Sequence, residues 1–299
     1  MTQRKRLPLW VHYLLMMAPG FAWMFIFSII PMVGIVMAFQ NFYPNRGWFG
    51  SEWVGFENFS YLFSMVAFRQ AVVNTLIIAV GKIVLNIVVP LTFALLLNEI
   101  KNVTFKKSVQ TIVYLPHFLS WVILANVLRN IFGIDGVFNL LIGLFGGEPR
   151  VWLTEVHLYR GFMIGTDVWK EFGYNAVIYL AALTGISPQL YEAAAIDGAS
   201  RWQATVHITI PSLIQTVILL TTLAMGNILN AGFDQIFNTY TPVTYETGDI
   251  IDTFVYRLGI VQMNFSTGTA AGLFKSVISF ILIISAYVLA YKFADYTIF

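Results

Sequence analysis

Charge is scarce in this chain, and cysteine is absent. Only 11% of the 299 residues are Asp, Glu, Lys or Arg, whereas soluble domains carry roughly a quarter. Hydrophobic residues make up 58%, which is more apolar surface than a soluble fold can bury, so the sequence predicts a membrane protein. The lack of cysteine excludes disulfides and thiolate metal sites. A net charge of only +2 gives no indication of nucleic acid as a partner.

Signatures of an ATPase or a metal site are also missing. The single Gly-Lys pair, Gly81-Lys82, is followed by Ile83 and has no upstream glycine of a phosphate-binding loop. The histidines are scattered along the chain: His12, His117, His157 and His207. No nucleophile stands beside a base, although Asp167 and Glu171 lie near each other. We therefore predict that the chain is not an enzyme and binds no cofactor or metal of its own.

Six apolar segments are long enough to cross a bilayer, which takes about 20 mainly apolar residues. They lie at roughly 13–39, 71–97, 109–131, 161–184, 212–233 and 270–292. These segments lack the period-two alternation that is typical of β-strands. The predicted fold class is therefore an all-α, polytopic membrane protein with six transmembrane helices.

The first apolar segment is predicted to be a retained helix. MTQRKR is basic, as the start of a signal peptide is, but the uncharged run after it extends from Leu7 to Asn45 without a small-residue cleavage site. Residues 1–69 then form an N-terminal cytoplasmic tail, the first transmembrane helix and an outer loop. Residues 70–295 form a core of five helices with a loop at 187–211, and residues 296–299 are a C-terminal tail.

Lysine and arginine mark one side of the predicted membrane protein. The basic residues of that side are Arg4, Lys5, Arg6, Lys101, Lys106, Lys107, Arg201 and Lys292. Acidic residues fall mostly in the opposite loops, which also hold Arg46, Arg150 and Arg257. Because basic loops stay in the cytoplasm and the number of spans is even, both termini are predicted to be cytoplasmic. The outer loops, at about 42–69, 132–160 and 234–268, are rich in aromatic and turn residues, so we expect them to be ordered.

One polar segment separates the fourth and fifth predicted spans and reads EAAAIDGASRWQATVHITIP over residues 192–211. Ser187, followed by proline, is a good helix start. Gly198 permits a break, and Ser200 with Gln203 three residues later is the pattern of a capping box that opens a second helix. Pro211 is tolerated at the start of the next helix. The segment is thus predicted to be a cytoplasmic helix-turn-helix.

The composition of this element favours docking on another protein. Its run of alanines leaves a flat surface that a partner's groove can approach, and Glu192 and Asp197 offer polar anchors. The alternative is an amphipathic helix resting on the bilayer. That alternative calls for a basic polar face, and only Arg201 is basic here.

Three parts of the segment resemble the EAA loop of ABC-importer permeases: Glu192-Ala193-Ala194, Asp197-Gly198-Ala199 and Ile208-Thr209-Ile210-Pro211. The family usually has Leu where this chain has Ile210. A further stretch, Gly55-Phe56-Glu57-Asn58-Phe59, is similar to the G-x-x-N-[FY] segment that precedes the core of the sugar-importing permeases. The resemblance covers about residues 70–295 and is strongest to the group that handles oligosaccharides and polysaccharide fragments.

The resemblance implies a type I ABC-importer permease fold in the bacterial cytoplasmic membrane. The loop would be a coupling helix that docks on an ATP-hydrolysing subunit. The matching residues are Glu192, Ala193, Ala194, Asp197, Gly198, Ala199 and Pro211. The implied partners are a second, homologous permease, two ATPase subunits that use ATP and Mg, and an extracytoplasmic solute-binding protein.

Polar residues inside apolar spans are the candidates for a solute pathway, because such groups are costly in lipid and are kept for function. The candidates are His117, Ser120, Trp121, Asp167, Lys170, Glu171, Tyr174, Asn175, Asn227, Asn230 and Asp234. Carbohydrate recognition uses this mixture, since amides and carboxylates bind hydroxyls and aromatic rings stack on sugar faces. In the resembled permeases the solute site lies on the third to fifth core helices. Lys170 is suited to receive the carboxylate of an acidic sugar.

Structural alternatives stand beside each of these assignments. Asp167, Lys170 and Glu171 share one helix face by their spacing and would neutralise each other. Asn227 and Asn230 would make interhelical hydrogen bonds. Lys82 is expected to snorkel to the membrane surface or to pair with a partner subunit, not to bind solute. The alternative function is an ion-coupled secondary transporter with Asp167, Lys170 and Glu171 as a proton relay. Six spans without visible repeats are few for that class.

Overall fold

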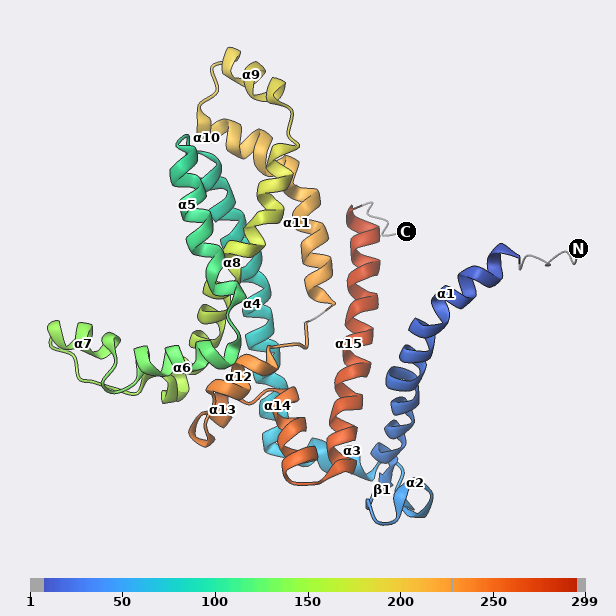
Figure 1. Cartoon of the computed structure of the whole chain (residues 1–299). Coiled ribbons are helices and arrows are strands. Elements are labelled where there is room, and N and C mark those ends of the chain that lie inside the picture. Colours follow the sequence, from blue (N-terminus) through green and yellow to red (C-terminus); the bar gives the residue numbers. More distant parts are fainter. Residues whose placement is uncertain (1–7, 227, 295–299) are drawn as a thin grey trace, which may run out of the picture. The chain divides into compact units, whose positions relative to one another are not determined.

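The computed structural model describes residues 8–226 and 228–294, which are almost entirely helical (Figure 1). They form two compact units, one of residues 8–64 with 257–273 and the other of residues 65–256 with 274–294. The last helix, α15 (Phe265–Ala294), begins in the first unit and continues in the second.

The first unit starts with one helical run of 31 residues, Leu9–Phe39. It consists of α1 (Leu9–Met24), a π-helical turn (η1, Phe25–Ile29) and a 3₁₀ helix (η2, Ile30–Phe39). Ala38 is its single buried residue. Since the run is apolar on all sides and almost nothing in its own unit covers it, it matches the predicted first transmembrane helix.

The predicted outer loop at 42–69 is ordered into short elements in this structure. These are β1 (Gln40–Asn41), α2 (Gly47–Gly50), β2 (Glu52–Trp53) and α3 (Glu57–Ser64). The two strands pair antiparallel, and Phe39 stacks on Trp53 with ring centroids 5.8 Å apart. The Phe42 N–H donates to Ser266 Oγ at 2.8 Å, which ties the loop to the start of α15 beside η7 (Arg257–Val261).

The second unit is built around two long helices that lie side by side, α4 (Val66–Asn98) and α8 (Val156–Thr184) (Figure 1). α5 (Val103–Tyr114) packs on α8, and Gly173 allows the close approach, because a Cβ at that position would collide with the carbonyl of Val113. α11 (Ile210–Met225) packs on both long helices, and Leu213 joins Ala94 and Tyr179 in one buried cluster.

Short elements complete the second unit. They are η3 (Leu115–Phe118), α6 (Trp121–Phe132), α7 (Val137–Leu144), η4 (Trp152–Thr154), α9 (Pro188–Ile196), α10 (Arg201–Ala204), η5 (Thr205–Thr209), α12 (Phe233–Thr239), η6 (Pro242–Thr244), α13 (Tyr245–Gly248) and α14 (Ile251–Tyr256). The predicted outer loop at 234–268 is therefore largely helical. Asn74 on α4 holds it, donating to the carbonyls of Glu246 at 3.1 Å and Asp249 at 2.9 Å.

Five helical stretches of the described residues are long and apolar enough to cross a membrane. They are Leu9–Phe39, Val66–Asn98, Trp121–Leu144, Arg201–Met225 and Phe265–Val288. α8 has the length, 29 residues, but carries Arg160, Asp167, Lys170 and Glu171. With α8 included, the predicted number of six membrane helices agrees with the structure.

Two predicted spans have the wrong limits. The segment 109–131 is not one helix, because the chain leaves helical geometry at Leu119 and Ser120 caps a new helix, α6, by accepting from the Ile123 N–H at 3.4 Å. In Figure 1, α6 and α7 turn away from the direction of α5. The segment 212–233 ends early, because α11 stops at Met225 and residues 228–232 form a non-helical connection to α12.

Candidate functional site

The predicted helix-turn-helix is present between α8 and α11. α9 ends in a turn in which the Ala199 N–H donates to the Ala194 carbonyl at 2.9 Å and the Gly198 N–H donates to the Ala195 carbonyl at 3.2 Å. This is the pattern of a Schellman motif, which needs a left-handed residue. Gly198 supplies it, with a φ of +79°.

The second helix of the element begins with the predicted capping box. Ser200 Oγ accepts from the Gln203 N–H at 3.3 Å, and the Ser200 N–H donates to Gln203 Oε1 at 2.7 Å. From Arg201 the helix runs without interruption through η5 into α11, so the second helix of the element and the helix that Pro211 was expected to start are one. Pro211 has no N–H to donate, and the backbone widens into the π-helical turn η5 directly before the helix that contains it.

The loop presents an exposed surface with a shallow hollow. Glu192, Ala193, Asp197 and Gly198 are exposed. Half-buried Ala194 and Ala199 line a depression of about 330 Å³ together with Asp197, Gly198, Gln203, Ala204, His207 and Ile208. The small side chains of the motif thus form the wall of a concave surface, as docking on a partner requires.

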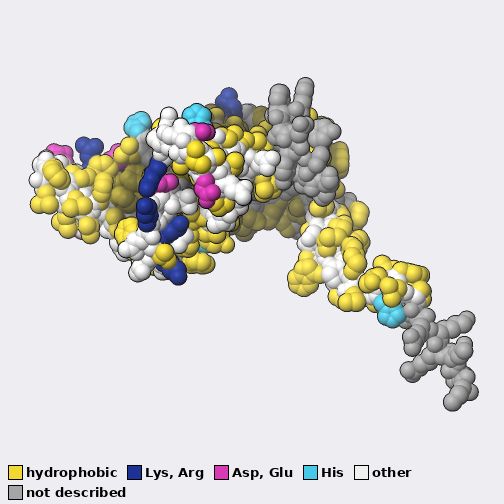
Figure 2. All heavy atoms as spheres, turned by 90° about the horizontal axis from the view of Figure 1, so that it is seen from above, with side chains coloured by type: hydrophobic (Ala, Val, Ile, Leu, Met, Phe, Trp, Pro, Cys, Tyr) yellow, Lys and Arg dark blue, Asp and Glu magenta, His cyan; other side chains and the backbone are white. Residues whose placement is uncertain are grey.

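The same end of the second unit carries basic residues. Arg201 at the start of α10 lies 3.6 Å from Glu99 at the end of α4, and both are exposed. Lys101 and Lys107 follow in the exposed connection to α5 and on α5 itself. Figure 2, which looks onto this end, shows Lys and Arg side chains gathered in a short row beside a few acidic ones.

A polar cavity of about 300 Å³ lies between α4, α8, α11 and the connection at 228–232. Its lining residues are Ala79, Lys82, Ile83, Asn86, Ile87, Asp167, Asn175, Ile178, Tyr179, Leu220, Ala224, Asn230 and Gly232. Three of the predicted pathway residues therefore meet here: Asp167, Asn175 and Asn230. A larger hollow of about 660 Å³ between α6, α7 and α8 is lined almost entirely by apolar residues, so it offers little to a sugar.

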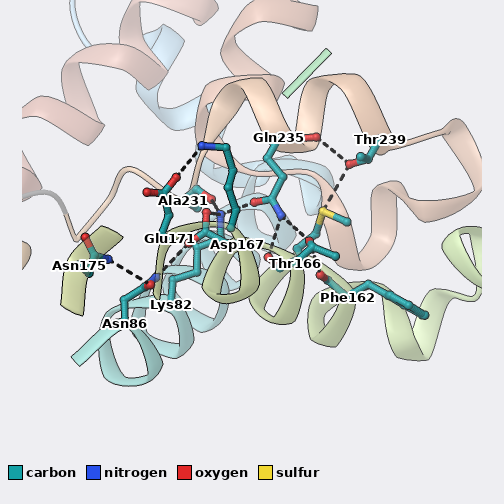
Figure 3. A network of polar contacts seen from close by, with 12 residues as sticks. Lys82, Asn86, Phe162, Thr166, Asp167, Glu171, Asn175, Ala231, Gln235 and Thr239 are labelled. Atoms are coloured by element: carbon teal, nitrogen blue, oxygen red, sulfur yellow. Dashed lines mark hydrogen bonds and ion pairs between the residues drawn. The ribbon is translucent and has the colours of Figure 1, made fainter. Parts of the chain in front are cut away.

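Lys82 lies at the centre of the polar network beside this cavity (Figure 3). Its Nζ is 3.0 Å from Asp167 Oδ1 and donates to the Ala231 carbonyl at 2.7 Å and to Gln235 Oε1. Lys82 is buried, with 7% of the residue exposed. The expectation that it snorkels or pairs with a partner subunit is therefore wrong, because its counter-charge comes from α8 of the same chain.

Amide side chains extend this network beyond Asp167 and Lys82. The Asn86 side chain donates to Asp167 Oδ2 at 3.0 Å and accepts from the Asn175 amide at 3.4 Å. Gln235 on α12 donates to the Met163 carbonyl and to Thr166 Oγ1, both at 2.8 Å. Asn86 and Gln235 were not predicted, although an amide among the apolar residues of a span is the signal that could have identified Asn86.

A second polar cluster lies on another side of α8, against η3 and α6. Lys170 Nζ lies 2.7 Å from Glu171 Oε1 and donates to the His117 carbonyl at 2.8 Å. His117 Nδ1 is 2.6 Å from Glu171 Oε2, and its ring stacks on Tyr174 at 3.9 Å between centroids. The Lys170 ammonium also lies 5.6 Å from the ring centre of Trp121.

The prediction that Asp167, Lys170 and Glu171 neutralise one another is thus half right. Lys170 pairs with Glu171, whereas Asp167 pairs with Lys82. One α-helical residue step is 100°, so three residues separate Asp167 from Lys170 by about 60° around the helix. That angle is enough to direct them to different neighbours.

The remaining predicted residues have separate positions. Ser120 is the cap of α6, and Asp234 is exposed in the first turn of α12. Asn230 is exposed and accepts from Lys275 Nζ at 2.7 Å. Asn227 lies outside the described residues. Among the residues that the structure describes, no group of three or more His, Asp or Glu side chains is placed to hold a metal ion.

Known proteins resemble this chain over nearly its whole length. The polygalacturonan/rhamnogalacturonan transport system permease protein YteP of Bacillus subtilis is 40% identical over 94% of this chain and 88% of the relative. A solved bacterial ABC transporter involved in the import of the acidic polysaccharide alginate contains a chain that is 36% identical, with a TM-score of 0.87 over 95% of this chain and 96% of that one. A solved bacterial alginate ABC transporter in complex with an alginate pentasaccharide-bound periplasmic protein contains a chain that is 36% identical, with a TM-score of 0.86 over 95% of this chain and 94% of that one.

The family match agrees with the architecture and with the loop. Residues 86–295 match the family described as "Binding-protein-dependent transport system inner membrane component". This range contains α8, the helix-turn-helix, α11 and the connection at 228–232. The chain is therefore a member of the binding-protein-dependent transport system inner membrane components, the permease subunits of ABC importers.

Proposed function

We propose that this chain is one of two permease subunits of an ATP-driven importer that takes up a carbohydrate, a fragment of an acidic polysaccharide. The observation that carries the proposal is the half-exposed cluster of His117, Glu171 and Tyr174 on a helix of the membrane core. Aromatic rings beside a carboxylate are what sugar binding uses. The relatives that import polygalacturonan, rhamnogalacturonan and alginate support the acidic class.

The cluster has the geometry of an open binding surface. Tyr174 is 46% exposed, and the side chains of His117 and Glu171 are 28% and 25% exposed. In lipid such groups are costly unless they face protein or water. If a second, homologous permease covered this face, the cluster would line a translocation pathway. Asn230 would lie at the margin of that pathway.

Lys170 is the residue that we assign to the carboxylate of the solute. Its ammonium is held by Glu171 and by the His117 carbonyl. Those contacts also fit the packing alternative, in which the ion pair only fixes α8 against η3. The two roles differ in what they predict for acidic and neutral solutes.

The concave loop at 187–211 is proposed to be the coupling element, with Glu192, Ala193, Ala194, Asp197, Gly198, Ala199 and Pro211 as its functional residues. Two ATPase subunits would bind ATP and Mg and hold this loop. An extracytoplasmic binding protein would deliver the solute, and both termini would be cytoplasmic. The basic residues Lys101, Lys107 and Arg201 at the end that bears the loop support this orientation. Nucleotide drives transport only if it binds the outward state more tightly than the inward state.

Uptake into proteoliposomes that contain the complete importer tests the proposal. Radiolabelled galacturonate oligomers should enter only when ATP is inside and the binding protein is outside. Accumulation driven by a proton gradient without ATP would instead support the ion-coupled alternative, which the relatives do not favour.

Two substitutions test the site. Tyr174→Ala should lower uptake at least tenfold, whereas Tyr13→Ala, at a 58% exposed position on α1, should leave it unchanged. Lys170→Met should reduce uptake of galacturonate oligomers more than that of neutral galactose oligomers. An equal loss for both solutes would assign Lys170 to packing.

A further inference from the structure

The connection at 228–232 separates α11 from α12 in the membrane core. α11 ends at Met225 and α12 starts at Phe233, and residues 228–232 are not part of either helix. Such non-helical backbone is tolerated within a membrane protein only where protein groups or a water-filled cavity satisfy it.

Lys82 holds the connection from the side of α4. Its ammonium donates to the carbonyl of Ala231, a residue with 0% exposure. Gly232 has a φ of +97°, and a Cβ on it would lie 2.7 Å from Lys82 Nζ. The absent side chain of Gly232 therefore makes the space that the ammonium occupies, while Asp167 balances its charge at 3.0 Å.

Lys275 on α15 holds Asn230, the residue before Ala231. Its Nζ donates to Asn230 Oδ1 at 2.7 Å and lies 2.5 Å from Asp252 Oδ1 on α14. Consecutive residues of the connection are thus bound by two lysines from two different helices. Each lysine is neutralised by a carboxylate from a further helix.

We propose that Lys82 and Lys275 are positioning residues that clamp the connection from two sides and fix the Asn230 amide at the edge of the cavity. An ammonium has three donors, so it can bind a carboxylate and a connection oxygen at once. Under the proposed function, on which this consequence rests, the clamp also anchors the far end of the helix that starts at the coupling loop.

Thiol labelling tests the clamp, because the chain contains no cysteine. A single cysteine replaces Leu229, which is 3% exposed, in the full-length chain in membrane vesicles. The measurement is its rate of modification by a water-soluble methanethiosulfonate reagent. Lys82→Met with Asp167→Asn should raise this rate at least tenfold, and Lys275→Met with Asp252→Asn should do the same. Both pairs remove the clamp contact without leaving an unpaired charge.

Three controls separate a clamp from a general loss of packing. Lys170→Gln with Glu171→Gln removes another ion pair of α8 and should leave the rate within twofold of the parent. Lys275→Arg keeps the N–H donors, so the cysteine of Leu229→Cys should stay protected from the reagent. A cysteine at Leu124 in α6, which is 1% exposed, should stay unreactive in every variant.

Rates within twofold of the parent in both clamp variants would overturn the proposal. A rise in only one of the two variants, when both are folded, would also overturn it. A loss of protection in Lys275→Arg as large as that in the variant with Lys275→Met would also overturn it. If the cysteine of Leu124→Cys also becomes reactive in the Lys82 variant, that variant has unfolded, and the Lys275 variant alone tests the proposal. In the Lys275 variant, a rise in labelling confined to residue 229 supports the clamp. An unchanged labelling rate at residue 229 refutes it. The assay uses neither sugar nor ATP, so its failure is distinct from failure of the transport assay.

Discussion

The ion pair between Lys82 and Asp167 should be costly to break from one side and much cheaper to remove as a whole. Lys82→Met leaves a half-buried carboxylate that, among the described residues, retains the Asn86 hydrogen bond alone, and it leaves the Ala231 carbonyl without its donor. Removing one partner of a buried pair costs about 3–5 kcal/mol. Asp167→Asn leaves the ammonium without its counter-charge and should cost a similar amount.

The double variant Lys82→Met with Asp167→Asn carries neither charge. Its remaining defects are the Ala231 carbonyl and Gln235 Oε1, which both lose the ammonium as a donor and together should cost about 3 kcal/mol. The two single costs together should therefore exceed the double cost by about 3 kcal/mol or more, which is at or above the upper end of the range for residues in contact.

Equilibrium unfolding by sodium dodecyl sulfate in mixed micelles measures these free energies of unfolding. Lys107→Met, at an exposed position on α5, is the control for loss of a lysine and should fall within about 0.5 kcal/mol of the parent. Single costs that add up to the double cost within about 0.5 kcal/mol would refute the reasoning, because independent sites are additive and paired charges are not.

Three further predictions concern glycines and a helix cap. Gly198→Leu should place a side chain in the left-handed region at a cost of about 1–2 kcal/mol and should reduce ATP-driven uptake while ATP hydrolysis continues. Gly55→Leu, at a φ of +60° outside the loop, is the matched control. Uptake by the Gly198→Leu variant equal to that of the parent would count against the coupling role. Ser200→Ala removes the capping box and should destabilise α10 by about 1 kcal/mol, measured as faster amide hydrogen exchange at the start of that helix; unchanged exchange would contradict the cap. Gly173→Ala should cost about 1–3 kcal/mol of unfolding free energy in detergent, because its Cβ collides with the α5 backbone. Gly165→Ala on the same helix meets nothing within 4 Å and should be neutral or slightly stabilising. Equal effects of the two substitutions would show that α5 moves away to accommodate the added methyl group.

Local signals in the sequence were sufficient for four of the six predicted spans and for the loop. The positions of the long helices follow from apolar length, which depends only on neighbours in the chain. The turn at Gly198 and the box at Ser200 are likewise local, because every atom that they bond lies within five residues. Sequence patterns describe such features well, since the same residues provide both the signal and the structure.

The breaks and the ion pairs were harder to predict. The break before α6 has a local signal in Ser120, but the apolar residues around it concealed the signal within one long hydrophobic run. The connection after Met225 is contacted by Lys82 and Lys275, which come from distant parts of the chain. The partner of Asp167 could not be chosen from spacing alone, because Lys170 is near in sequence and Lys82 is near in space.

The uninterrupted helix from Arg201 to Met225 has a mechanical consequence. Its 25 residues make a rod of about 37 Å, with the exposed loop at one tip and the clamped connection just beyond the other. A rod pivoting near its fixed tip turns a wide stroke into a slight rotation: about 6 Å of travel at the free tip corresponds to roughly 10° at the pivot. Under the proposed function, a displacement of the loop at Gly198 by an ATPase subunit would therefore tilt this helix by only a small angle beside the cavity.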